Sequence, residues 1–194
     1  HSAVSLRVIE HGPCTLAARY AFKLAMIRKT HVVSASKYTI QHAADGLFEE
    51  AVEAISHQYP GIGYRRELFD AMLAGIIMFP ERYGVIVTPN EYGDFLSDML
   101  CGLIGSIGLG DSSSFSFDED GDVHFAMFDP AGGTAPDIAG QGIANPLAVL
   151  MSGVMMMEYI GEHKVAERIN RAIWDVLEEG KTLTGDLGGT ANTE

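Results

Sequence analysis

The 194-residue chain is 47 % hydrophobic and 20 % charged, a composition typical of a globular protein. Its formal net charge of -13 argues against nucleic acid or an anionic membrane as the main partner, because both select for basic protein surfaces. The two cysteines, Cys14 and Cys101, predict neither a disulfide framework nor a zinc site. The longest apolar run, 147–160, is too short and too interrupted to span a membrane.

Helical and strand patterns alternate along the first half of the chain. Apolar residues at helical spacing predict a helix over 15–28 with Thr15 as its N-cap, and the β-branched run 31–36 predicts a strand. The same criteria predict helices over 45–57, 66–79 and 91–104 and a strand over 83–88.

The second half begins with a segment rich in Gly, Ser and Asp. We interpret this segment, 105–121, as a loop and as the boundary between two domains, 1–105 and 106–194. A strand over 123–128 and an irregular stretch over 130–145 follow, and Pro146 is well placed as the first residue of a long helix. The last helix is predicted over 163–179. Helices that alternate with short strands indicate an α/β architecture.

Two carboxylates are spaced for cation binding in the segment that begins at Asn90. Asp94 and Asp98 are four residues apart near the start of a predicted helix, so both point from one face. Carboxylates this close repel one another unless a cation lies between them, and Mg²⁺ or Mn²⁺ prefers such oxygen ligands. The alternative is that acidic residues simply stabilise the start of the helix.

Two further charged residues stand at the ends of predicted elements. Lys37 directly follows the strand 31–36, and a lysine at such a place can act as a general base or as an ordinary surface charge. Asp70 follows Leu68 and Phe69 at a predicted helix start and by itself indicates nothing.

A glycine-rich loop occupies 128–146. Its glycines allow a ligand to approach the backbone closely, and Asp137 could accept hydrogen bonds from a ribose diol. The loop does not contain the G-x-G-x-x-G fingerprint, so its residues favour either a nucleotide loop or an ordered connector.

Together these segments resemble the isocitrate/isopropylmalate dehydrogenase family, whose members are metal-dependent β-decarboxylating dehydrogenases. The family pattern Asn-x-x-Gly-Asp-Ile-Leu-Ser-Asp is matched from Asn90 to Asp98. The pattern Gly-Ser-Ala-Pro-Asp-Ile-Ala-Gly-Lys-Gly-Ile-Ala-Asn-Pro is matched from Gly133 to Pro146, and the Asp-Leu-Gly-Gly motif is matched from Asp186 to Gly189. The resemblance extends along nearly the whole chain and covers the C-terminal half of the family's chain.

The resemblance implies a role for each matching residue. Asp94 and Asp98 would bind Mg²⁺ or Mn²⁺ with Asp70 of the neighbouring protomer, and Lys37 would be the catalytic lysine, also contributed across the dimer. Asp70 would thereby act in both catalysis and metal binding. The residues that would bind NAD are Asp129, Gly133, Thr134, Ala135, Asp137, Ile138 and Asn145. NADP-using members tend to carry Lys-Tyr where Asp137 and Ile138 stand, so the resemblance favours NAD.

The implied reaction is NAD-dependent oxidation of a 2-hydroxy acid that carries a β-carboxylate, followed by loss of CO₂. Isocitrate is the expected substrate because the segment 45–48 resembles the isocitrate and homoisocitrate branch, and isopropylmalate and homoisocitrate are the alternatives. The family implies a homodimer with a shared active site, located in the cytoplasm, or in the mitochondrial matrix of a eukaryote. The expected fold is the family's two-domain α/β fold without its N-terminal half.

The chain departs from the family pattern at two cofactor-loop positions, because Gly132 stands where the family has a histidine that faces adenine and Thr39 where it has an asparagine. The arginines that hold the substrate's carboxylates belong to the family's N-terminal half. A second hypothesis therefore stays open, namely a non-catalytic or regulatory member, or a fragment, that retains metal or nucleotide binding. In the domain assignment, 1–105 would form the smaller, dimerising and metal-binding domain and 106–194 part of the larger, cofactor-side domain.

Overall fold

The computed structural model describes residues 1–118 and 120–193 and divides into two compact units, His1–Leu96 and Ser97–Glu194. Both units contain helices and strands, so the predicted α/β class is confirmed. In the part of the chain that the structure describes, no helix combines the length and the apolar character needed to cross a membrane.

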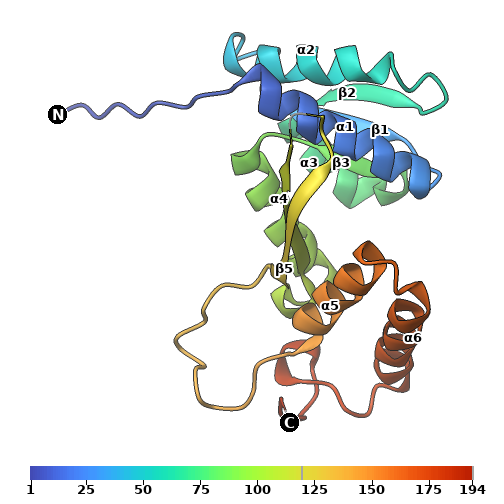
Figure 1. The fold of residues 1–194 in the computed structure, drawn as a ribbon. Coiled ribbons are helices and arrows are strands. Elements are labelled where there is room, and N and C mark those ends of the chain that lie inside the picture. Colours follow the sequence, from blue (N-terminus) through green and yellow to red (C-terminus); the bar gives the residue numbers. More distant parts are fainter. Residues whose placement is uncertain (119, 194) are drawn as a thin grey trace. The chain divides into compact units, whose positions relative to one another are not determined.

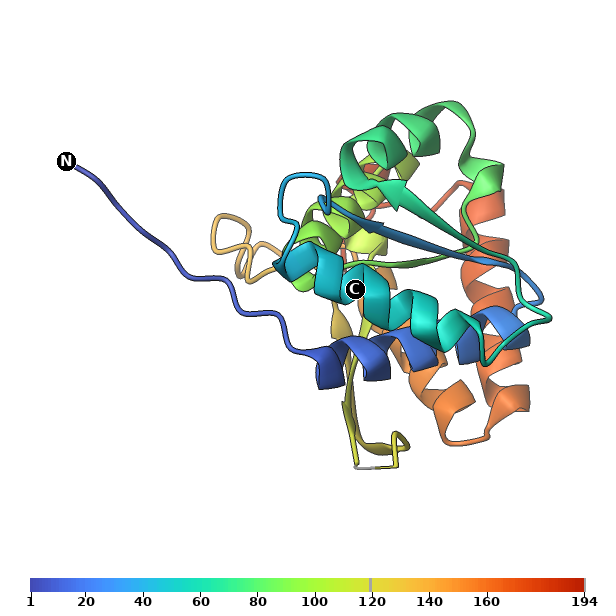
Figure 2. The same ribbon diagram turned by 90° about the horizontal axis from the view of Figure 1, so that it is seen from above.

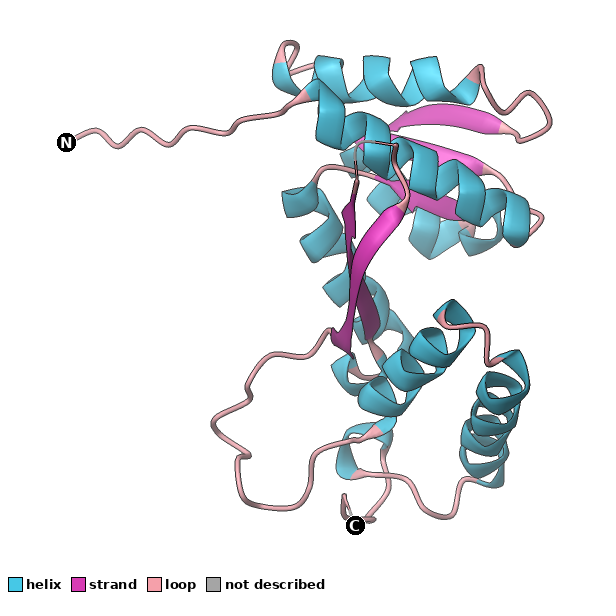
Figure 3. Cartoon of the chain, viewed as in Figure 1, coloured by secondary structure: helices cyan, strands magenta, loops and turns pink. Residues whose placement is uncertain are grey.

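The first unit is built on a three-stranded parallel sheet. Its strands are β1 (Val32–Ser36), β2 (Tyr64–Leu68) and β3 (Val85–Val87), in the order β2-β1-β3. Two helices, α1 (His11–Ile27) and α2 (Ala44–Ser56), pack together on one face of the sheet, and α3 (Phe69–Met78) lies against the other (Figures 1 and 3). Figure 2 shows α1 and α2 side by side from above.

The central strand β1 is buried along its whole length because both of its faces are covered. Successive side chains of a strand point to opposite faces, so Val32, Ser34 and Ser36 share one side. Val32 joins the core between the sheet, α1 and α2, and the two serines meet Glu49 of α2. Phe22 of α1 is fully buried in the same core.

The second unit contains a β-hairpin and two helices. The strands β4 (Asp111–Phe117) and β5 (Val123–Pro130) pair antiparallel, and α5 (Leu147–Tyr159) packs against both of them. The last helix, α6 (His163–Glu179), packs on α5 through a small core of Val154, Ala166 and Ile173. It ends at Gly180 in the left-handed conformation (φ 65°), which glycine adopts without strain.

The helix α4 (Asn90–Ile104) carries the chain from the first unit into the second. The described residues also form the short 3₁₀ turns η1 (Pro80–Arg82), η2 (Ile107–Leu109) and η3 (Gly185–Leu187). The segment between β5 and α5 lacks regular structure, as predicted.

Three local predictions were wrong. Thr15 is not an N-cap, because α1 already begins at His11 and the Thr15 hydroxyl donates to the carbonyl of His11 one turn earlier. The predicted helix 66–79 begins only at Phe69, because Arg66 and its neighbours form β2. The predicted loop 105–121 contains β4, whose partner strand β5 is needed to complete its hydrogen bonds. A fourth prediction differs by one residue, because Pro146 is the N-cap of α5 and the helix begins at Leu147, one residue after the predicted start.

Candidate active site

Lys37 and Asp70 lie at the same edge of the sheet. Ser36, the last residue of β1, pairs with Leu68, the last residue of β2, so the residues that follow these parallel strands emerge together. The Nζ of Lys37 lies 2.7 Å from Oδ1 of Asp70. The structure thereby brings together two predicted site residues that are far apart in the sequence.

The Lys37–Asp70 ion pair stands at the surface. The side chain of Lys37 is 33 % exposed and that of Asp70 is 63 % exposed, so solvent or a ligand can reach both groups. The hydrogen bond from Lys37 is the main reason that the pKa of the Asp70 carboxyl lies below its usual range. Asp70 is therefore an anion across the physiological pH range, with the charge that a metal ligand needs.

Asp94 and Asp98 lie one turn apart in α4, as predicted, and both residues are exposed. Carboxylate oxygens in this arrangement fit a hard divalent cation such as Mg²⁺ or Mn²⁺. Within residues 1–118 and 120–193 of one chain, no three His, Cys, Asp or Glu side chains come close enough together to hold a metal ion. A metal ion bound by these two carboxylates would therefore need further ligands from other groups.

The predicted cofactor residues divide into two groups. Gly133, Ala135, Ile138 and Asn145 line a cavity of about 640 Å³ in the second unit, which falls in the size range of ligand pockets. Thr134 lines a neighbouring hollow, which shares Gly133, Ala135 and Ile138 with this cavity. Ala135 has a positive φ of 39°, an unfavourable conformation for a residue other than glycine.

The two predicted acidic cofactor residues, Asp129 and Asp137, lie outside the linings of these two pockets and are exposed. The Asp129 carbonyl accepts a hydrogen bond from Ser152 of α5 at 2.9 Å. The Asp137 carbonyl accepts one from the Gln141 side chain at 2.7 Å. In both residues these hydrogen bonds are made by the backbone carbonyl.

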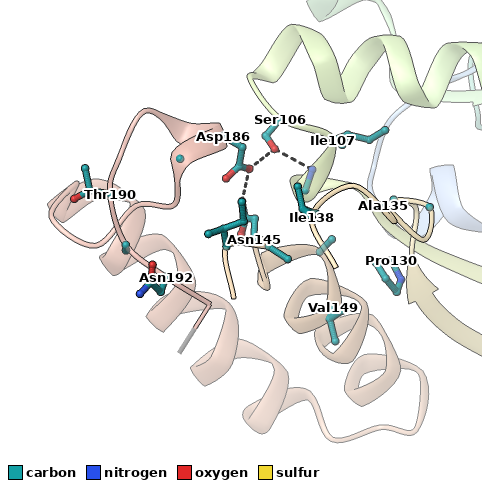
Figure 4. A pocket seen from close by; sticks show the side chains of 18 residues that line it. Ser106, Ile107, Pro130, Ala135, Ile138, Asn145, Val149, Asp186, Thr190 and Asn192 are labelled. Carbon is teal, nitrogen blue, oxygen red and sulfur yellow. Dashed lines mark hydrogen bonds between the residues drawn. The ribbon is translucent and has the colours of Figure 1, made fainter. Parts of the chain in front are cut away.

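One wall of the cavity is polar; its Asn145 was predicted to bind the cofactor, whereas Ser106 and Asp186 were not predicted as site residues. Asp186 Oδ2 accepts hydrogen bonds from Ser106 Oγ and, at 2.9 Å, from Asn145 Nδ2 (Figure 4). Burial raises the pKa of the Asp186 carboxyl, but these and other side-chain hydrogen bonds outweigh that effect and hold the pKa below its usual range. Asp186 therefore remains ionised and orients the amide of Asn145.

Close packing behind this wall requires glycine at position 108. A Cβ at Gly108 would lie 2.9 Å from Asn145 Cβ and 3.2 Å from Asp186 Oδ2. The Gly108 amide donates to Ser106 Oγ at 2.9 Å, so the backbone itself supports the wall. Asn145 also accepts a hydrogen bond from the Leu147 amide at 3.0 Å, which fixes it at the start of α5.

Other parts of the cavity wall are apolar. They are formed by Ile107, Ala135, Ile138, Ile143 and Val149. Apolar walls beside one carboxylate and one amide suit a flat heteroaromatic ring with a polar edge, such as adenine. The Asp-Leu-Gly-Gly motif was noted in the sequence, but its position beside Asn145 depends on how the C-terminal segment folds back.

Sequence comparison shows what the chain is similar to. The family model described as isocitrate/isopropylmalate dehydrogenase matches residues 1–194. The chain is 39 % identical to the mitochondrial NAD isocitrate dehydrogenase catalytic subunit 6 of Arabidopsis thaliana, over 97 % of this chain and 50 % of that protein. It is 38 % identical to a mitochondrial regulatory subunit of NAD isocitrate dehydrogenase from Dictyostelium discoideum, over 98 % of this chain and 52 % of that protein. The chain thus spans about half the length of these curated relatives.

Structure comparison agrees with this similarity. The crystal structure of isocitrate dehydrogenase from Methylococcus capsulatus matches the chain with a TM-score of 0.92 at 37 % sequence identity. The match covers 99 % of this chain and 56 % of that chain. The predicted fold, part of a larger two-domain α/β arrangement, is therefore confirmed.

Proposed function

The chain belongs to the isocitrate/isopropylmalate dehydrogenase family, and on that premise we propose that it supplies half of the active site of an NAD-dependent β-decarboxylating dehydrogenase. The observation that carries the proposal is the 2.7 Å ion pair between Lys37 and Asp70. A lysine and a carboxylate held together at the carboxyl ends of parallel strands can serve proton transfer and cation binding at one place.

In this proposal the two copies of a homodimer share each active site. One copy contributes Asp94 and Asp98 from α4, and the other contributes Asp70 together with Lys37. Asp70 and Lys37 come as a unit because they already pair within one chain. The three carboxylates form an oxygen ligand set of the kind that Mg²⁺ or Mn²⁺ prefers, with substrate oxygens or water completing it.

The cavity beside Asn145 would hold the adenosine end of NAD. Ile138 and the other apolar walls would exclude water from the faces of the adenine ring, and Asn145 would bind its polar edge. Asp137 is exposed and is the acidic residue suited to the free ribose hydroxyls of NAD. Gly133 and Thr134 in the loop would also contact the nucleotide. Asp129, near the end of β5, would contact it as well.

The metal ion, when bound, would supply electrophilic polarisation of the substrate, and NAD would supply the acceptor for its hydride. The residues of this chain would bind, orient and move protons. Lys37 would relay the proton lost from the substrate's hydroxyl, and Asp70 would keep the Lys37 ammonium in place until the relay begins. In the overall reaction isocitrate and NAD⁺ would give 2-oxoglutarate, CO₂ and NADH.

Isocitrate is the proposed substrate, and isopropylmalate and homoisocitrate are the alternatives within the same chemistry. The second candidate function is a regulatory member that binds metal or nucleotide without turnover. The similarity to a regulatory component of an NAD isocitrate dehydrogenase favours this candidate, and so does Gly132 in place of the family's histidine.

Turnover and binding measurements separate the two candidates. The chain is assayed alone and as a fusion behind the N-terminal half of the Methylococcus capsulatus enzyme, with Mn²⁺, NAD and each of the three substrates. NAD binding to the chain alone is measured by calorimetry. A Lys37→Met fusion is the matched control for background reduction of NAD.

The proposal expects NADH formation by the fusion with isocitrate, and loss of at least about a hundredfold of that rate in Lys37→Met. Saturable NAD or metal binding with no turnover by the fusion would favour the regulatory function and overturn the enzymatic one. An equal rate in the Lys37→Met fusion would overturn the assignment of Lys37.

A further inference from the structure

Asp45 is a fully buried carboxylate in the first turn of α2. Acidic residues are common at helix starts because they complement the helix dipole, but they normally do so from the solvent side. Burial of a charge costs free energy unless hydrogen bonds and an opposite charge compensate it. The contacts of Asp45 therefore call for an explanation beyond the stability of α2.

A single oxygen of Asp45 joins two segments that carry predicted site residues. Oδ2 accepts the backbone N–H of Lys37 at 2.8 Å and the hydroxyl of Tyr92 at 3.0 Å. Lys37 lies just beyond the last residue of β1, so its amide is bound by Asp45 instead of by the neighbouring strand. Tyr92 lies in the first turn of α4, two residues before Asp94.

Tyr92 extends the connection to a third segment. Its ring stacks on Phe69, with centroids 4.7 Å apart and planes inclined by 25°. Phe69 is buried and directly precedes Asp70 at the start of α3. Lys37, Asp70 and Asp94 are thus each within two residues of a group held by Asp45 or by its partner Tyr92.

Arg7 compensates the charge of Asp45 from the N-terminal segment. Its Nη1 lies 2.9 Å from Asp45 Oδ1, and its guanidinium lies over the Tyr92 ring, 4.9 Å from the centroid. The Arg7 side chain is 29 % exposed, so it can turn to solvent when its partner is removed. Three groups of the first unit thus hold the Asp45 carboxylate, namely the Lys37 amide, the Tyr92 hydroxyl and the Arg7 guanidinium.

We propose that Asp45 is a positioning residue that fixes Lys37 relative to Asp70 at the start of α3, through Tyr92 and Phe69, and so sets the geometry of proton transfer. This inference rests on the proposed function of Lys37. A displacement of a reacting group by about 1 Å costs about a hundredfold in rate, so loss of this anchor is expected to lower kcat while substrate affinity changes little.

Glu49 provides a matched control for a purely structural role. It is the other fully buried carboxyl group of α2, one turn further along, and it binds the hydroxyls of Ser34 and Ser36 instead of a backbone amide of the site. A purely structural account predicts similar effects for changes at Asp45 and Glu49. The positioning account predicts a difference between them.

The first measurement uses the 194-residue chain itself and does not depend on turnover. Amide hydrogen exchange is followed by NMR in the wild type and in Asp45→Ala, Asp45→Asn and Glu49→Gln. We expect the Lys37 amide to exchange at least about tenfold faster in Asp45→Ala, with the amides of Val33 and Ala35 in β1 unchanged. Asp45→Asn keeps an acceptor oxygen and is expected to restore most of the protection.

The second measurement compares kcat and KM of the same variants in the fusion that supplies the missing half. Asp45→Ala is expected to lower kcat by about ten- to a hundredfold at nearly constant KM, and Asp45→Asn to recover most of it. Glu49→Gln is expected to stay within about threefold of the wild type in kcat. If Asp45→Ala does not fold, Tyr92→Phe tests the same anchor, because it removes one hydrogen bond to Oδ2 and keeps the ring stacked on Phe69.

Unchanged Lys37 exchange in Asp45→Ala would overturn the proposal, whether or not the fusion turns over. Equal losses of kcat in Asp45→Ala and Glu49→Gln would also overturn it, and so would failure of Asp45→Asn to recover either quantity. Faster Lys37 exchange in a fusion without any turnover would support the anchor and refute only the proposed function.

Discussion

The most informative prediction for stability concerns Glu49. Its side chain is fully buried between α2 and β1, and its two carboxylate oxygens each accept a serine hydroxyl at 2.5 Å. Burial raises the pKa of this carboxyl, and the hydrogen bonds from Ser34 and Ser36 offset the rise only in part. We predict that Glu49→Gln removes a pH-dependent loss of stability from the first unit.

The direction follows from the pKa difference between the folded and unfolded states. Because the folded pKa of Glu49 lies above the ordinary value of 4.5, the folded state holds the proton more tightly than the unfolded state. The associated stability is fully present below the unfolded pKa and is lost as pH rises through the folded pKa. Each unit between the two pKa values corresponds to about 1.4 kcal/mol of unfolding free energy.

The glutamine variant keeps the shape of the side chain but cannot ionise. It can accept from one serine and donate to the other, so its hydrogen-bonding loss is small, about 1 kcal/mol. Its unfolding free energy is therefore expected to vary less with pH than that of the wild type, from about pH 5 upward. The carboxyls with lowered pKa values, Asp70 and Asp186, lose their stabilising contribution only as pH falls below their ordinary value of 3.8, so it stays constant in this window.

The assay is urea unfolding at several pH values, followed both by hydrogen exchange of β1 amides and by fluorescence. The single tryptophan, Trp174, lies in α6 of the second unit and serves as an internal control. The pH effect is expected in the β1 amides and not in the local signal of Trp174. A wild-type stability that rises between about pH 5 and about pH 7 at β1, or an identical pH profile in Glu49→Gln, would refute this reasoning.

Three further predictions concern the core and the cavity. Phe22→Ala is expected to lower the unfolding free energy by about 3–5 kcal/mol in urea titrations, because Phe22 is fully buried in the core of the first unit. Gly108→Ala is expected to weaken NAD binding about tenfold by calorimetry, because its Cβ would press on Asn145. Gly132→Ala is the control. Its Cβ would meet open space, so its NAD affinity is expected to stay within about twofold of the wild type. Asp186→Ala is expected to weaken NAD binding about fivefold through the lost support of Asn145, and unchanged affinity would show that the amide is held without it.

Several elements could be predicted because their signals are local. The last helix was predicted with its observed limits, His163–Glu179, since its apolar residues keep helical spacing throughout. The strand β1 was recognised from its β-branched run. By contrast, β2 has the sequence Tyr-Arg-Arg-Glu-Leu, and only its parallel pairing with β1 makes it a strand. The same holds for β4. Its serines carry no strand signal, and only Phe115 and Phe117 favour a strand.

The same limit applies to the candidate site. Lys37, Asp70, Asp94 and Asp98 were predicted through the family resemblance, yet the contact between Lys37 and Asp70 depends on the register of β1 with an unrecognised strand. The support residues were missed because their partners are distant in sequence. Tyr92 is 47 residues from Asp45, and Ser106 is 80 residues from Asp186. The sequence could have drawn attention to Tyr92 and Ser106 only through their partners Asp45 and Asp186, because each of these is a carboxylate without an oppositely charged residue close by in the chain.

The most direct test of the proposed activity is the stoichiometry of oxidation and decarboxylation. Isocitrate labelled at the β-carboxylate is supplied with NAD and Mn²⁺ to the fusion that completes the site, and labelled CO₂ and NADH are counted together. The account predicts one CO₂ for each NADH, with both absent in Lys37→Met and both dependent on Asp94 and Asp98. NADH without CO₂, or neither product despite bound NAD and metal, would contradict it.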